Sequence, residues 1–144
     1  MNREVKIKVT GWQTAPDGSL AEPIVREADG LYYLKNHRHY LIYDEIAEEG
    51  GVRADTHCVM KFTPLELSVK RTGPVNAELN FHKDRQTKAY YETPFGNIEM
   101  EIESGLFHLE EEAKRICFGL DYTLKAEGSP ALMNRLLVEI EEKE

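Results

Sequence analysis

An alternation of apolar and polar residues with a period of two is the feature that most constrains how this chain can fold. The alternation is cleanest over residues 52–62, 98–103 and 116–124. Successive side chains of a β-strand point to opposite faces of a sheet, so these runs predict strands with one buried face. Turn-forming residues interrupt the pattern about every 8–12 residues, a spacing typical of antiparallel sandwiches and barrels. We expect roughly nine or ten short strands and no long helix.

Nearly every interruption is short enough for a hairpin, which favours consecutive up-and-down strands over crossing connections. An open sheet with this many strands would expose two unpaired edges, and closure into a barrel removes them. The expected fold class is therefore all-β, a single closed antiparallel barrel of 8–10 strands that is mostly up-and-down. With 144 residues, the chain is most simply one domain over residues 1–144. A chain of this length buries roughly 68–70% of its unfolded surface and needs no metal or disulfide for stability.

Three local patterns carry specific structural expectations. The dipeptide Asp29-Gly30 predicts a hairpin between a weak strand over 24–28 and another over 31–35. Thr93–Gly96 fits a type I turn followed by a left-handed glycine, which also predicts a hairpin. The segment 106–114 is the one helix-like part of the chain, but it is short for an isolated helix, and we favour a strand there.

The charge of the chain limits its partners. The formal net charge is −8, and the lysines and arginines are scattered without forming a block. Nucleic acids and anionic membranes attract proteins through basic surfaces, so neither is expected to be the main partner.

The sequence also indicates a compartment. No apolar run approaches the ~20 residues of a membrane helix, and residues 1–9 alternate where a signal peptide would have an apolar core. We therefore expect a cytoplasmic protein. In a reducing compartment, Cys58 and Cys117 are expected to remain free thiols.

Arg71 is the residue that most stands out from the alternating pattern. Leu67 and Val69 alternate with polar residues, and continuing the alternation places Arg71 on the apolar face of the strand. An arginine on the inside of a sheet requires a partner, because an isolated buried charge costs several kcal/mol or more.

Glu45 is the natural partner of Arg71 if Tyr43 and Glu45 face the barrel interior. The alternation over 37–47 does not choose between its two faces, because neither set is purely apolar. In one interpretation, Arg71 closes a barrel end by bonding to Glu45 and to backbone carbonyls, which is the commoner role of a buried ion pair. In the other, Arg71 presents its two-pronged guanidinium to the carboxylate or phosphate of a ligand.

Tyrosines could complete a ligand site around Arg71. If Tyr43, Tyr91 and Tyr122 point inward, they form with Arg71 and Glu45 an amphipathic cavity wall suited to a small molecule. For any single tyrosine, ordinary core packing with an internally bonded hydroxyl is the alternative.

No motif predicts a catalytic residue, a metal or a cofactor. The spacing His-x-His places two imidazoles on one strand face, but no Cys-x-x-Cys, His-Glu-x-x-His or acidic loop accompanies it. Cys58 has no histidine or lysine in phase with it, so a nucleophilic thiol is not expected. The chain also lacks a Gly-x-Ser-x-Gly motif, a phosphate-binding loop and a dinucleotide fingerprint. All five histidines are expected to face solvent: His37, His39, His57, His82 and His108.

Four segments occur in the order and approximate spacing of a known group of proteins: Tyr43–Glu45, Val69–Gly73, Tyr91–Gly96 and Asp121–Leu124. With them, the chain resembles the YwiB-like family, small uncharacterised bacterial proteins with a calycin-like (lipocalin-like) β-barrel. The resemblance covers nearly the whole chain, and its most telling parts are Arg-x-Gly and Tyr-x-Thr-Pro-x-Gly. It implies a barrel fold and implies no activity.

Three functions remain open. The first is a barrel whose lumen binds a small amphipathic or anionic molecule, which Arg71 and the tyrosines favour. The second is a structural or interaction barrel that forms a homodimer or binds a protein partner. The third and weakest is an enzyme that uses Glu45 and Arg71 with a tyrosine as acid or base. Large inner residues that would fill the core favour the second function: Met60, Phe62, Phe81, Met100 and Phe118.

Overall fold

A computed structural model describes residues 3–14 and 17–143 of the chain. Over these residues the backbone forms ten β-strands and no helix, so the described residues contain no apolar helix long enough to cross a membrane. The strands are β1 (Glu4–Thr14), β2 (Ile24–Lys35), β3 (Arg38–Glu49), β4 (Val52–Phe62), β5 (Glu66–Thr72), β6 (Asn76–His82), β7 (Thr87–Thr93), β8 (Gly96–Glu111), β9 (Arg115–Lys125) and β10 (Leu132–Glu142).

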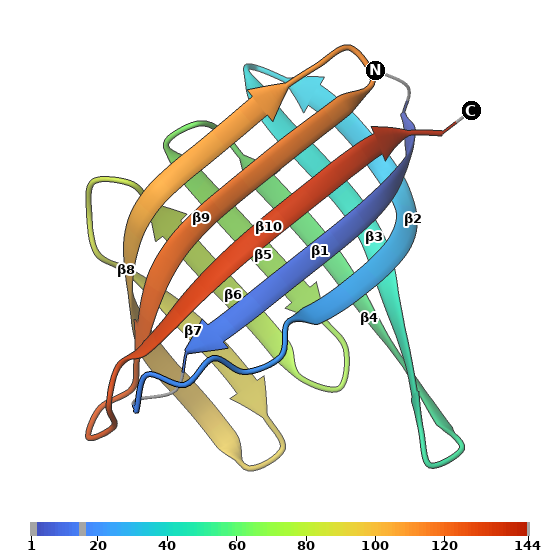
Figure 1. Ribbon diagram of the computed structural model, residues 1–144. Coiled ribbons are helices and arrows are strands. Elements are labelled where there is room, and N and C mark those ends of the chain that lie inside the picture. The colour runs from blue at the N-terminus through green and yellow to red at the C-terminus, as the bar shows by residue number, and fades with distance from the viewer. Residues whose placement is uncertain (1–2, 15–16, 144) are drawn as a thin grey trace.

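The strands form one closed antiparallel barrel in which each strand pairs with its neighbours in sequence (Figure 1). The barrel closes where β10 pairs with β1, from Val5 opposite Glu142 to Thr14 opposite Met133. Closure gives every strand two neighbours and so removes the exposed outer edges of an open sheet. The predicted fold class, an all-β, up-and-down antiparallel barrel, is confirmed, with ten strands.

The up-and-down order of the strands gives the barrel two different ends. At the top of Figure 1, β1 begins and β10 ends, and we call this the termini end. The turns that follow β1, β3, β5, β7 and β9 lie at the opposite end, which we call the distal end. Side chains near the last residues of β3 and β5 therefore share the distal end.

Inward-facing apolar side chains fill the middle of the barrel. The rings of Phe62 and Phe118 lie with centroids 4.8 Å apart, and both side chains are almost completely buried. Met60 and Phe81 are buried in the same cluster, and Met100 packs against it. Burying a side chain of this size contributes about 1.5–3 kcal/mol, so this packed interior is the main source of stability.

The predicted hairpin at Asp29-Gly30 is wrong, because β2 runs through both residues without a break. The chain reverses instead at Asn36 and His37, whose φ angles of +52° and +63° suit a two-residue type I′ hairpin. Gly30 is required for a different reason. A Cβ atom there would lie 2.6 Å from the carbonyl oxygen of Ile42. The glycine marks a close approach between strands inside the barrel wall.

The Thr93–Gly96 hairpin forms as the turn residues predict. Thr93 pairs with Gly96, and Gly96 has a φ of +128°, which favours glycine. The turn brings the end of β7 back into β8 at the distal end of the barrel.

β8 continues to Glu111 and confirms the strand predicted for most of the segment 106–114. Its pairing with β9 changes register between Ser104 and Phe107. This bulge moves the buried set from even-numbered residues such as Ile102 to odd-numbered residues such as Phe107. A shift in phase of one residue interrupts the alternation, which is why the pattern resembles a helix here.

Candidate functional site

Arg71 and Glu45 form an ion pair inside the distal end of the barrel. Arg71, on β5, donates two hydrogen bonds to the Glu45 carboxylate on β3, with Nη1–Oε1 at 3.2 Å and Nη2–Oε2 at 2.6 Å. The Glu45 side chain is only 11% exposed and that of Arg71 34%. This two-pronged geometry is the strongest form of an arginine–carboxylate contact. Glu45, the expected partner of Arg71, is therefore also its observed partner.

Strand register explains why these residues meet. On β3, Leu41, Tyr43 and Glu45 face the barrel interior, a choice that the alternation alone left open. A row of direct cross-strand partners then leads around the wall through inward-facing residues: Tyr43, Cys58, Arg71, Ala77 and Tyr91. The row brings three of the five predicted site residues to one level of the barrel.

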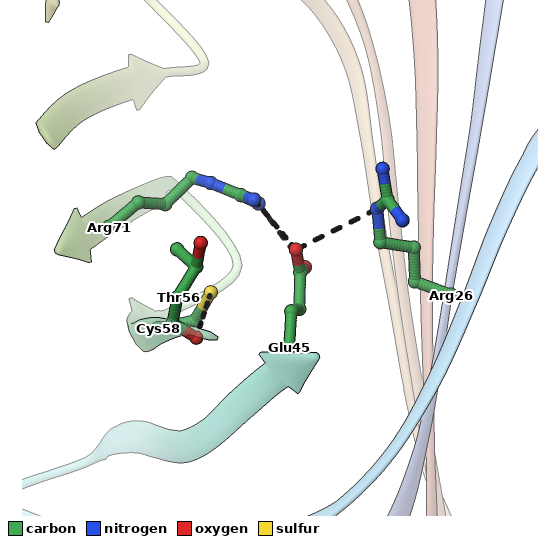
Figure 2. A network of polar contacts seen from close by, with 5 residues as sticks. All are labelled: Arg26, Glu45, Thr56, Cys58 and Arg71. Carbon is green, nitrogen blue, oxygen red and sulfur yellow. Dashed lines mark hydrogen bonds and ion pairs between the residues drawn. The ribbon is translucent and has the colours of Figure 1, made fainter. Parts of the chain in front are cut away.

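Arg26 is a member of the site that the sequence analysis missed. Its Nε lies 3.7 Å from Oε2 of Glu45, and its side chain is half-exposed. Figure 2 shows Arg26 and Arg71 approaching Glu45 from opposite sides. Arg26 is in phase with Ala28 and Gly30 on the inner face of β2. The hairpin expected at Asp29-Gly30 concealed that alternation, because it divided the strand in two.

Two guanidinium groups therefore share a single carboxylate, and the cluster carries one surplus positive charge. Burial disfavours the charged form of Arg71, but the hydrogen bonds that Arg71 donates to Glu45 and the negative charge of Glu45 outweigh burial and raise the pKa of Arg71. Both guanidinium groups are partly exposed to solvent, and a surplus cation in such a place is suited to attracting an anion.

Tyr43 lies beside this cluster with an unsatisfied hydroxyl. The residue is only 4% exposed, and its hydroxyl makes no hydrogen bond of normal geometry to a described residue, although the Cys58 thiol stands beside it as a weak partner. Burial raises the pKa of Tyr43, and the negative charge of Glu45 raises it further. A buried hydroxyl without a partner costs about 1–3 kcal/mol, so its retention requires an explanation.

Tyr91 and Tyr122 also point into the barrel. Burial raises the pKa of Tyr91, although the charge of Arg71 opposes the shift. Burial likewise raises the pKa of Tyr122 to about 12, and its ring makes an edge contact of 4.9 Å with Phe81. At neutral pH these phenols are protonated, so they can donate hydrogen bonds but are poor general bases.

Cys58 stands next to Arg71 in the pairing of β4 and β5. Burial nevertheless raises the pKa of its thiol to about 11, which outweighs the effect of the neighbouring guanidinium. The thiol is therefore protonated at neutral pH and is not activated as a nucleophile. Cys58 and Cys117 are both free, as predicted.

The prediction that all histidines face solvent is wrong for His39. The residue is 4% exposed, and its ring stacks on Phe62, with ring centroids 4.8 Å apart. The inward-facing set of β3 includes residue 39, and the apolar neighbours in that set account for its burial. No group of three or more potential metal ligands occurs among the residues described by the structure.

His39 connects two other polar side chains at the termini end. Its Nδ1 lies 2.7 Å from the hydroxyl of Tyr32, and its Nε2 lies 2.5 Å from Oε1 of Glu111. Burial lowers the pKa of His39, and the charge of Glu111 only partly opposes that shift. The network ties β2, β3 and β8 together at the termini end of the barrel.

This lowered pKa predicts a loss of stability in acid. The folded protein holds His39 neutral, whereas the unfolded chain protonates it near its ordinary pKa of 6.5. The neutral His39 therefore makes its full contribution to the stability of the folded protein above about pH 6.5. This contribution is lost as the pH falls through the lower pKa of His39 in the folded state. We expect urea unfolding between pH 7.5 and 5 to show a smaller pH dependence in His39→Gln than in the parent.

His57→Gln is the matched control for that measurement, because His57 is an exposed histidine on the outer surface, paired with Asp44. The unfolding free energy of His57→Gln should depend on pH as that of the parent does, because the buried imidazole of His39 is still present. If His39→Gln and His57→Gln gave the same pH profile, the buried imidazole would not be the group that destabilises the barrel in acid.

Comparison with known proteins identifies the family of this chain. A family model described as a domain of unknown function, DUF1934, matches residues 7–138. The chain belongs to the DUF1934 family. A curated relative, the uncharacterised β-barrel protein YwiB of Bacillus subtilis (strain 168), is 28% identical over 123 residues, which cover 84% of each chain. The resemblance to YwiB-like proteins seen in the sequence is confirmed.

A solved structure agrees with the barrel of this DUF1934 member. The crystal structure of the YwiB protein from Bacillus subtilis superposes with a TM-score of 0.82 at 20% identity. The match covers 99% of this chain and 93% of the other. It establishes a shared fold, and YwiB itself carries no assigned activity in its name.

Proposed function

We propose that this protein binds a small anionic molecule with an apolar part at the distal end of its barrel. One observation carries the proposal: Arg26 and Arg71 converge on the single carboxylate of Glu45 and leave one positive charge unbalanced. A purely structural ion pair requires only one arginine. The second cation supports a site built to receive an anion.

Hydrogen-bond donors for the anion are present in the same cluster. A guanidinium has five N–H donors, and Arg71 uses two of them on Glu45 within the described part of the chain. The unsatisfied hydroxyl of Tyr43 is a further donor. A carboxylate or phosphate group can accept from both residues at once, which suits a fork of charged donors.

The packed middle of the barrel favours a ligand position near the distal end. Phe62 and Phe118 occupy the centre, whereas Arg71 and Tyr91 are only partly buried. The apolar part of the ligand would lie against Tyr91 and Tyr122, in a calycin-like and lipocalin-like use of the barrel interior. We also propose a cytoplasmic location, with which the two free thiols agree.

A thermal-shift screen of carboxylates and phosphate esters with apolar substituents tests this function. A ligand present at 100 times its dissociation constant stabilises a folded protein by about 2.7 kcal/mol. We expect Arg26→Gln and Arg71→Lys each to weaken a hit at least tenfold, because each loses part of the cationic fork. Arg135→Gln, on the outer surface with Asp121, should leave the affinity unchanged. Equal affinity in Arg71→Lys and the parent would contradict the site.

Tyr43→Phe separates a ligand role from a structural role. Removing a buried hydroxyl without a partner should leave the free energy of unfolding unchanged or raise it by about 1 kcal/mol. The same substitution should weaken an anionic ligand, because the site loses a donor. A clear loss of stability in Tyr43→Phe would show that the hydroxyl has a structural partner.

The alternative is an interaction barrel that forms a homodimer. Large aromatic side chains fill the interior, and an outer groove of about 570 Å³ is lined by Trp12, Leu20 and Met133. Leu20 and Met133 are both well exposed, and exposed apolar patches of this kind often mark protein contacts. Sedimentation analysis decides this alternative: a dimer that Met133→Glu converts to monomer would support it.

The enzyme hypothesis has less support in the site. Glu45 is held by two arginines, and the neighbouring tyrosines have raised pKa values. The raised pKa values keep the phenols of Tyr91 and Tyr122 protonated at neutral pH, and the Glu45 carboxylate is engaged by hydrogen bonds from Arg71, so this cluster offers no free general base.

A further inference from the structure

The barrel wall is split between β2 and β3 at the distal end. These strands pair only where Gly30–Lys35 lies opposite Arg38–Tyr43. Beyond Gly30, the segment Ile24–Asp29 of β2 pairs only with β1 among the described residues. On the other side, residues 44–49 of β3 pair only with β4. In Figure 1, the hairpin of β3 and β4 diverges from β2 towards the lower right.

Both sides of this split carry unpaired backbone groups. A strand directs alternate N–H and C=O groups to its two neighbours, so a segment paired on one side leaves the other half without strand partners. Two such edges face each other here, Ile24–Asp29 and residues 44–49. Unpaired edges of this kind are templates for another strand.

The hairpin tip that forms one side of the split has little support of its own. β4 pairs with β5 only from His57 onward, so residues 44–56 form a two-stranded ribbon. On the β5 side, Gly73 lies against Asp55 and Thr56, so that part of the ribbon has a neighbour. An isolated two-stranded ribbon is marginally stable, and a third strand on the open side would stabilise it.

The side chains around the split indicate what such a strand would carry. An outer groove of about 500 Å³ crosses the split and is lined from β2 by Glu27 and Asp29 and from β3 by Asp44 and Ile46. Ile46 is 58% exposed, and Leu31 in the same groove is also exposed. The groove lining therefore combines carboxylates with exposed apolar residues, although Lys8 and Lys6 of β1 stand opposite Glu27 and Asp29. This lining complements an extended segment that combines basic and apolar side chains.

We propose that the split between β2 and β3 binds an extended basic and apolar segment of another polypeptide, which adds a strand to the wall. Backbone hydrogen bonds to the two edges provide affinity, and the carboxylates select lysine or arginine. Lys143 and His57, which pair with Asp29 and Asp44, give way to the cations of the segment. This site uses the outer face and the edges of the wall, whereas the anion site lies on the inner side, where Arg26 and Glu45 meet across the split.

A peptide with alternating valine and lysine, labelled at its N-terminus, is the probe. We expect it to bind by fluorescence anisotropy, with affinity that falls as salt is raised. A peptide with valine and glutamate should bind at least tenfold more weakly. A valine–lysine peptide with N-methylated amides keeps its side chains but loses its backbone donors, and it should also bind at least tenfold more weakly.

Hydrogen exchange locates the binding. The valine–lysine peptide should slow the exchange of amides within Ile24–Asp29 and residues 44–48. Exchange of the amides in the other strands should be unaffected. Glu27→Lys should weaken binding, whereas Glu78→Lys, an exposed strand carboxylate on β6, should not. Arg71→Lys should leave peptide affinity unchanged, which separates this site from the anion site.

Three results would overturn the proposal. The first is equal binding of the N-methylated peptide, which would show adhesion through side chains only. The second is absence of binding by the valine–lysine peptide. The third is protection of the same two edges without peptide in a concentration-dependent dimer, which would assign the split to a second copy of this chain.

Discussion

Arg71→Met is expected to lower the free energy of unfolding by about 2–3 kcal/mol. Removing one member of a buried ion pair costs roughly 3–5 kcal/mol, because the remaining charge loses its partner in a poorly solvated place. The lower figure applies here because a third of the Arg71 side chain is exposed and solvent screens part of the charge. Glu45 would retain only Arg26, at 3.7 Å. Urea denaturation measures the change.

A double-mutant cycle makes the source of this loss clear. Glu45→Leu alone should also destabilise the protein, because Arg71 is left without its acceptor. The double variant should cost clearly less than the sum of the two single changes, since replacing a buried pair by apolar residues is often close to neutral. Additive costs would show that the two residues do not stabilise each other.

Arg115→Met is the matched control on the outer surface. Arg115 pairs with Glu139 at 2.8 Å, and its side chain is more exposed than that of Arg71. Exposed pairs contribute about 0–1 kcal/mol, so this substitution should have little effect. If Arg115→Met and Arg71→Met lowered the free energy of unfolding equally, the interior position of Arg71 would not add to the stability of the protein.

Gly30→Ala is expected to cost about 3 kcal/mol or more. The added Cβ would lie 2.6 Å from the carbonyl oxygen of Ile42 and 2.5 Å from Cδ1 of Ile7. A side chain can move away from such a contact, but the backbone oxygen belongs to the neighbouring strand and cannot move without distorting the wall. Overpacking of a close-packed interior typically costs 1–3 kcal/mol and occasionally more. Thermal and urea unfolding both measure the loss.

Gly11→Ala provides the control for the change of residue type. Gly11 lies on the adjacent strand β1, and a Cβ there would meet nothing within 4 Å. Because alanine reduces the freedom of the unfolded chain, this substitution should be neutral or stabilising by about 0.4–1 kcal/mol. Combining Gly30→Ala with Ile7→Val should recover only part of the loss, since the Ile42 oxygen remains in place. Complete recovery would show that the backbone contact is harmless.

The barrel was predictable because its strands are half-buried. A sheet with one face on a packed core imposes a strict period of two, and this chain shows it most clearly over 98–103 and 116–124. The prediction failed where another requirement overrode the local signal. Asp29-Gly30 has the composition of a turn, but Gly30 is present because a strand passes too close for any side chain.

The candidate site was predictable only in part. Arg71 was conspicuous because a charge occupied an apolar phase, and Glu45 followed as the acidic residue able to meet it. Arg26 was missed, since an incorrect turn separated it from the phase of β2. His39 was placed in solvent because its strand has two mixed faces, and only packing against Phe62 selects the inner one.

Alternation and turn-forming residues along the chain were enough to predict most strands and an all-β barrel, because side-chain direction in a strand is a local property. The turn predicted at Asp29-Gly30 was nevertheless wrong. Three features depend on how the strands are set against one another in the barrel. They are the contact of Glu45 with Arg26 and Arg71, the unsatisfied hydroxyl of Tyr43, and the split between β2 and β3. Register and strand divergence follow from the packing of the whole barrel, and no single segment of the chain encodes them.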